Sequence, residues 1–83
     1  MNKTIKLRVK REIGNKNELM ILKLKGKLIS NGFTEIIHIA DENENSYLNS
    51  FSISSDTEKQ VEKFVLDYIS EYNISGMITL INN

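Results

Sequence analysis

Apolar residues recur at helical spacing through residues 55–72, and this is the clearest pattern in the chain. Six of them fall three or four residues apart and so share one side of a helix, with charged residues on the other side. The segment opens with Ser55 and, three positions later, Glu58, which is the capping-box pattern of a helix start. We therefore expect an amphipathic helix lying on a sheet, with an apolar stripe of Val61, Phe64, Val65, Tyr68, Ile69 and Tyr72.

Alternation of apolar and polar residues predicts strands on both sides of this helix. Residues 33–40 are rich in isoleucine, and a polar turn at 41–45 joins them to the alternating residues 47–54 as a hairpin. A last strand is expected at 74–81, interrupted at Ser75 and Gly76. Residues 4–13 predict a first strand that turns Ile5, Leu7 and Val9 toward the helical layer and Lys6, Arg8 and Lys10 away from it.

The segment 18–31 allows two interpretations. As a helix it places Met20, Ile21, Leu22, Leu24, Leu28 and Ile29 on one broad arc, between a cap-like Asn15–Glu18 pair and a stop at Asn31-Gly32. As a strand, residues 18–25 would pair with residues 4–13 across the Gly14-Asn15-Lys16-Asn17 turn. Gly26 costs a helix about 1 kcal/mol relative to alanine. The helix is favoured because the apolar arc continues through Ile29 to the stop signal.

With that helix the element order is β-α-β-β-α-β in a single domain of residues 1–83. This order predicts a four-stranded antiparallel sheet with both helices on one face, the ferredoxin-like plait. If residues 18–25 form a strand instead, the fold is an antiparallel β-rich sheet covered by one C-terminal helix. A fold of either kind does not define a function.

Charge is distributed unevenly along a chain whose formal net charge is zero. Residues 1–27 hold nine Lys and Arg against two Glu, whereas residues 28–83 hold two Lys against nine Asp and Glu. No stretch approaches the ~18 apolar residues that span a bilayer. The N-terminus carries charges where a signal sequence has an apolar core. We therefore expect a cytoplasmic protein that does not associate with membranes.

Histidine and cysteine, two residue types that often carry catalysis or bind metals, are scarce. The chain has no cysteine and one histidine, His38, within a predicted strand, so neither a His/Cys metal site nor a serine triad is indicated. The segment from Asp41 begins like a calcium loop, but Ser46 and Ser52 stand where that loop needs glycine and glutamate. The four glycines are too far apart to form a phosphate loop. These observations predict no enzymatic activity and no cofactor.

The separated charges favour a protein-binding module, such as a small regulator or inhibitor of the kind that phages and mobile elements encode, docking on a larger protein. The alternative is a nucleic-acid-binding domain that uses the basic open face of the first strand, and self-association as a homodimer is a third option. The residues expected to contact a partner are Lys6, Arg8, Lys10, Lys23, Lys27, Asp56, Glu62, Asp67 and Glu71.

Overall fold

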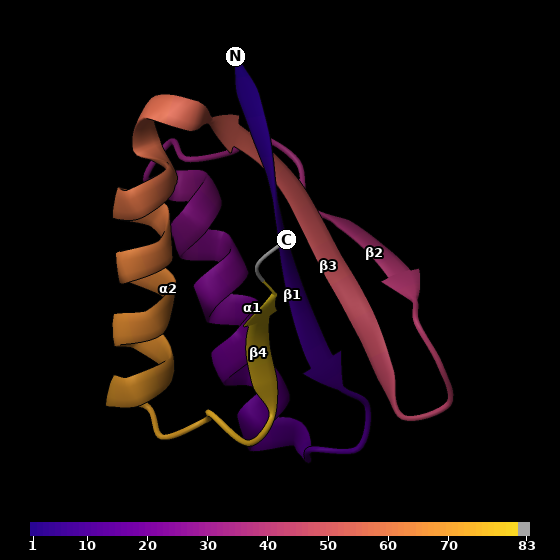
Figure 1. Ribbon diagram of the computed structural model, residues 1–83. Coiled ribbons are helices and arrows are strands. Elements are labelled where there is room, and N and C mark those ends of the chain that lie inside the picture. Colours follow the sequence, from indigo (N-terminus) through magenta and orange to yellow (C-terminus); the bar gives the residue numbers. More distant parts are fainter. Residues whose placement is uncertain (82–83) are drawn as a thin grey trace.

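The computed structural model describes residues 1–81 and has two layers, a sheet and a pair of helices (Figure 1). The element order is the expected β-α-β-β-α-β, and the segment 18–31 is helical, so the hairpin interpretation of residues 18–25 is wrong. The elements are β1 (Asn2–Lys10), α1 (Asn15–Ser30), β2 (His38–Asp41), β3 (Ser46–Ser54), the short 3-10 helix η1 (Ser55–Thr57), α2 (Glu58–Glu71) and β4 (Ile78–Ile81).

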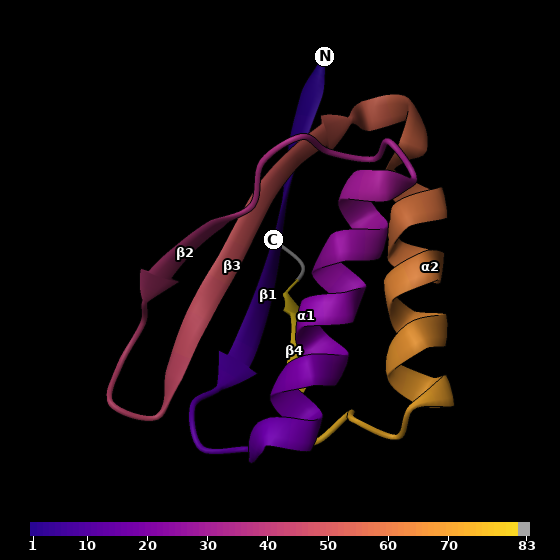
Figure 2. The same cartoon turned by 180° about the vertical axis from the view of Figure 1, so that it is seen from behind.

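The four strands form an antiparallel sheet in the order β2-β3-β1-β4. β1 and β3 are the central strands and pair along their full length, from Asn2 opposite Ser54 to Lys10 opposite Ser46. β2 and β4 are short edge strands of four residues each. Both helices lie on the same face of the sheet, as the two opposite views show (Figures 1 and 2).

The core forms where the helices meet the inner face of the sheet. Alternation along β1 and β3 places their odd-numbered residues on this face, so Leu7 and Phe51 are buried against the helices. Each fully buried aliphatic or aromatic side chain stabilises the fold by about 1.5–3 kcal/mol. The two helices are also joined directly, because the Tyr68 hydroxyl donates a hydrogen bond of 2.7 Å to the carbonyl oxygen of Met20. The buried apolar residues are Ile5, Leu7, Val9, Ile21, Leu24, Leu28, Phe51, Ile53, Val61, Val65, Tyr68, Ile69, Ile74 and Ile78.

Three of the expected strands have other limits than the sequence pattern indicated. The first, expected at 4–13, runs from Asn2 and already ends at Lys10. The strand expected at 33–40 begins only at His38, because Phe33 packs against the core and Phe64 and thereby draws residues 33–37 away from the sheet. The strand expected at 74–81 begins only at Ile78. Ile74 is buried in a turn, where its carbonyl oxygen accepts hydrogen bonds from the Met77 and Ile78 N–H groups.

The helix starts also differ from the expected caps. α2 is preceded by η1, in which the Thr57 hydroxyl donates to the Ser54 carbonyl oxygen at 2.8 Å, so no Ser55–Glu58 capping box forms. α1 starts after Gly14, whose φ of 84° favours glycine, and not with Asn15 as the cap. The stop at Asn31-Gly32 is confirmed, with Gly32 at a φ of 79°.

Candidate functional site

The open face of the sheet carries the cationic residues of β1, but only part of their charge is free. Lys6, Arg8 and Lys10 project from this face because they alternate with the buried residues of β1. Arg8 makes two hydrogen bonds of 2.6 Å to the Glu42 carboxylate. Neither lysine has a carboxylate within 4.0 Å among residues 1–81. The open face therefore presents two free lysines and one neutralised arginine.

The other residues expected to bind a partner lie in the helical layer, on the opposite side of the sheet. Lys23 and Lys27 are exposed on α1. On α2, Glu62 is half-buried, and the Asp67 carboxylate forms an ion pair with Lys63, four residues earlier. The nine expected residues thus form two groups separated by the sheet: Lys6, Arg8 and Lys10 in one, and Lys23, Lys27, Asp56, Glu62, Asp67 and Glu71 in the other.

All six aromatic residues of the chain lie away from the open face. Tyr47 and Phe51 alternate with the residues of β3 that form this face, and both pack in the core. Phe33 follows α1 and packs against Phe64, and the remaining two tyrosines belong to α2 and its C-terminal end. The open face therefore lacks the stacking side chains on which sheet-type binders hold single-stranded RNA.

Four large aliphatic side chains are exposed along the β2 side of the molecule, and we call them the aliphatic edge. Leu22 and Ile29 of α1 are 61% and 45% exposed, and Ile36 and Ile39 are each 62% exposed. Leu22 and Ile29 were expected within the covered arc of α1. They are exposed because the buried line of this helix is narrower than the arc and consists of Ile21, Leu24 and Leu28.

A polar pair lies beside the aliphatic edge. Lys25, on the same flank of α1 as Leu22 and Ile29, donates a hydrogen bond of 3.2 Å to Oδ1 of Asn49. Asn49 is fully buried, and Ile39 pairs directly opposite it. Burial lowers the pKa of the Lys25 ammonium group. The Nδ2 group of Asn49 has no hydrogen-bond partner among residues 1–81. This buried polar pair lies between two exposed aliphatic surfaces, and its unpaired Nδ2 group lowers the stability of the fold.

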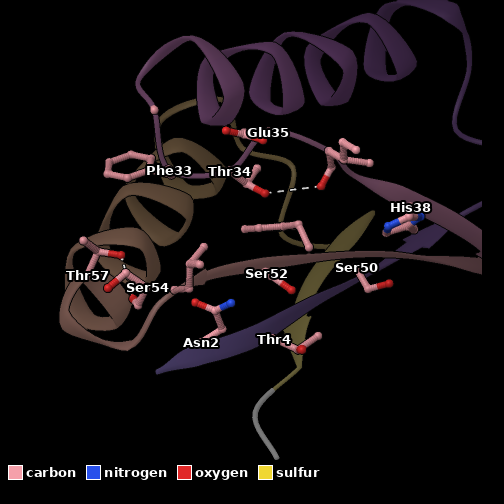
Figure 3. A pocket seen from close by; sticks show the side chains of 14 residues that line it. Asn2, Thr4, Phe33, Thr34, Glu35, His38, Ser50, Ser52, Ser54 and Thr57 are labelled. Atoms are coloured by element: carbon pink, nitrogen blue, oxygen red, sulfur yellow. Dashed lines mark hydrogen bonds between the residues drawn. The ribbon is translucent and has the colours of Figure 1, made fainter.

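A cavity of about 680 Å³ lies beside the end of β3 that extends beyond its pairing with β2 (Figure 3). Its two sides are β3 from Ser50 to Ser54 and the segment from Gly32 to Ile36. Hydroxyl groups of both central strands line it, as do the side chains of Phe33, Ile36 and Ile53. The cavity is therefore polar toward the open face and apolar toward the helices.

The residues that could support catalysis do not assemble. His38 is exposed at the start of β2, directly opposite Ser50, and among residues 1–81 no carboxylate accepts a hydrogen bond from its ring. In the same part of the chain, no three His, Asp or Glu side chains are placed so as to hold a metal ion. None of the helices within residues 1–81 combines the length and the apolar run needed to cross a bilayer.

Comparison of the chain with protein-family models, with curated proteins and with solved structures finds no match.

The sequence pattern identified the cationic open face but not the aliphatic edge or the polar pair. The pattern predicts a strand that contains Ile36 and Ile39, and it does not indicate that their side chains are exposed. The one available signal was Asn49, a polar residue at an inward position between Tyr47 and Phe51. An inward position of a strand is normally apolar, and Asn49 breaks this pattern.

Proposed function

We propose that the protein is a non-enzymatic binding module, a small cytoplasmic regulator or inhibitor that docks on a larger protein. The observation that carries this proposal is the aliphatic edge, in which four large side chains from α1, β2 and the segment between them are exposed. Exposed aliphatic side chains grouped at one edge are typical of protein interaction sites.

The charged residues of the helical layer would orient the partner. α1 carries the exposed Lys23 and Lys27, whereas η1 and α2 carry Asp56, Glu62, Asp67 and Glu71. The surface formed by α1 and α2 therefore has a positive electrostatic potential over α1 and a negative one over α2. Such a pattern sets the orientation of a partner and the rate of encounter more than the affinity.

The ferredoxin-like plait is part of this proposal. Its support is the strand order, which from the other edge reads β4-β1-β3-β2 with the first and third strands in the centre. Because both helices lie on one face, the opposite face of the sheet is free for binding.

A second candidate function is nucleic-acid binding by the open face. Lys6 and Lys10 favour it, since two free cations on a surface with several hydroxyl groups can contact phosphates. The ion pair between Arg8 and Glu42 and the inward aromatic residues favour the protein-binding function instead.

Affinity capture from the cells that produce the protein separates the two functions. Wild type is compared with the double variant Ile36→Asp/Ile39→Asp and with Lys6→Gln/Lys10→Gln, each with and without nuclease. We expect a protein that is still captured after nuclease treatment. Its recovery should fall at least tenfold with the aspartate variant, because a charge in an apolar interface costs more than 1.4 kcal/mol.

Both pairs of substituted positions lie on the surface, so circular dichroism serves to confirm that each variant remains folded. Recovery unchanged by the aspartates, or lost on nuclease treatment, would rule out the proposed function. Loss of recovery with the glutamine variant alone would point to the open face. Recovery of a second copy of the chain as the captured protein would identify a homodimer.

A further inference from the structure

The hydrogen-bonding direction of each residue in β3 follows from two contacts. In an antiparallel ladder the N–H and C=O groups of one residue point to the same side, and successive residues point to opposite sides. Just beyond β3, the Ser55 N–H donates to the Met1 carbonyl oxygen at 3.0 Å, so odd-numbered residues of β3 point toward β1. The Glu42 N–H donates to the Ser46 carbonyl oxygen at 3.2 Å, so even-numbered residues point toward β2.

β2 uses only part of this outward edge. It pairs with β3 from His38 opposite Ser50 to Asp41 opposite Tyr47, and it does not extend further. Ser52 and Ser54 point toward the same edge, where no backbone group of residues 1–81 pairs with them. The Ser54 carbonyl oxygen already accepts a hydrogen bond from the Thr57 hydroxyl. Three backbone groups therefore remain open, namely the N–H and C=O of Ser52 and the N–H of Ser54.

The cavity of about 680 Å³ lies along these open groups (Figure 3). In an antiparallel pair, residues directly opposite each other place their side chains on the same face. A residue opposite Ser52 or Ser54 would thus face the hydroxyl-lined open face, and a residue opposite Ile53 would face the apolar side that Phe33 lines. The cavity fits an extended segment with a small polar, an apolar and a small polar residue in succession.

The direction and length of this segment follow from the surrounding chain. Every strand pair in the sheet is antiparallel, and an antiparallel segment here runs in the same direction as β2. Its leading end then meets Ile37 and His38, which occupy the path. Three residues of strand span about 10 Å, which corresponds to the stretch from Ser54 to Ser52. A segment that stops there, before Ile37 and His38, ends with its C-terminus, because it runs in the direction of β2.

We propose that this cavity binds the C-terminal end of a partner protein as an added strand beside β3. The terminal carboxylate accepts a hydrogen bond from the Ser52 N–H, which makes this bond charge-assisted. In Figure 3 His38 lies beside Ser50 at this end of the cavity, where its ring can contact the carboxylate, whereas Glu35 lies on the α1 side. The inference rests on the proposed protein-binding function and specifies the part of the partner that is bound.

Pairing with the same edge of a second copy does not fit the structure. A two-fold axis at Ser52 would bring Ser54 of one copy opposite Ser50 of the other. The outward groups of Ser50 already pair with His38 of its own chain. A two-fold axis at Ile53 would bring Ser54 of one copy opposite Ser52 of the other, and the chain would then continue through Ser55 into the path that Ile37 and His38 occupy. The occupant is therefore a free chain end and not an identical strand.

The test uses two substitutions of one residue. Ser52→Pro removes the outward N–H without breaking a hydrogen bond to β1, and proline is tolerated at such a position of an edge. Ser52→Ala keeps the N–H and is the matched control. The probe is a display library of random heptapeptides with free C-termini, selected on wild type, with the recovered peptides then synthesised both with a free carboxylate and with an amide end.

We expect recovered peptides to bind wild type and Ser52→Ala alike and Ser52→Pro at least tenfold more weakly. The amide-ended forms should also bind at least tenfold more weakly. Bound peptide should slow amide hydrogen exchange of Ser52 in wild type at least tenfold, a readout that does not depend on the folding of the proline variant. Recovery of no peptide, equal binding to Ser52→Pro, or unchanged Ser52 exchange would overturn the inference. If Ser52→Pro still captures the cellular partner through the aliphatic edge, the proposed function stands and only the inference fails.

Discussion

Replacing Asn49 by leucine is expected to raise the free energy of unfolding by about 1–2 kcal/mol, even though it removes a hydrogen bond. Asn49 is fully buried, and its Nδ2 group has no partner among residues 1–81. An unsatisfied buried polar group costs about 1–3 kcal/mol, and leucine has the same branched shape as asparagine with methyl groups in place of the amide. Loss of the hydrogen bond from Lys25 costs less stability than removal of the unpaired amide gains. The half-buried ammonium group of Lys25 can be hydrated instead.

Chemical denaturation of wild type, Asn49→Leu and Asn49→Ala measures the effect. The alanine variant also removes the amide but leaves space unfilled, so it should be less stable than the leucine variant by about 2 kcal/mol or more. A leucine variant less stable than wild type would mean that the Lys25–Asn49 hydrogen bond outweighs the unpaired Nδ2 group. In that case the polar pair makes a net stabilising contact.

The Glu42 carboxyl group is expected to titrate with a pKa of about 2, well below its ordinary value of 4.5. Hydrogen bonds from the Arg8 guanidinium and from the Ser46 hydroxyl to the carboxylate lower the pKa, with Arg8 the larger cause. Because the folded-state pKa is depressed, the pair stabilises the fold above pH 4.5. This contribution is lost as the pH falls from there through about 2.

NMR titration of the Glu42 side chain in wild type and in Arg8→Met checks this. The substitution should raise the pKa toward 4.5, though not fully, since Ser46 still donates. Lys6→Met is the control, because Lys6 projects from the same face of β1 and should leave the Glu42 titration unchanged. A wild-type pKa near 4.5 would show that Arg8 is not held by Glu42, and the open face would then present a third free cation.

The type of secondary structure was predictable for the long segments, because the spacing of their own apolar side chains determines whether a strand or a helix can bury them. β1, β3 and α2 each alternate or repeat over nine residues or more, and one face of each has to be buried. The helical interpretation of residues 18–31 was correct for a similar reason, since Ile21, Leu24 and Leu28 form a continuous buried line.

The limits of β2 could not be predicted in the same way. Residues 33–40 have the composition of a covered strand, yet Ile36 and Ile39 are exposed because α1 buries only a narrow line of its own residues and leaves the β2 side uncovered. The start of the strand depends on where Phe33 packs, and its partner Phe64 is 31 positions later in the chain. The Arg8–Glu42 pair likewise depends on a register between elements that are distant in sequence.

An open strand edge promotes aggregation unless access to it is restricted. Here two features restrict it. The segment from Gly32 to Ile36 forms one side of the cavity, and β2 blocks one end of the free stretch of β3. Only a short chain end can therefore approach the Ser52 N–H, and this would make the edge selective.

Amide hydrogen exchange of the free protein tests most directly whether the edge of β3 is open. We expect slow exchange for Phe51 and Ile53, which point toward β1, and for Ser50, which pairs with β2. The Ser52 and Ser54 N–H groups should exchange within about tenfold of the rate of an unprotected amide. Protection of Ser52 equal to that of Phe51 would mean that residues 34–36 of the chain itself fill the edge, and the proposed binding of a partner's C-terminus would then be wrong.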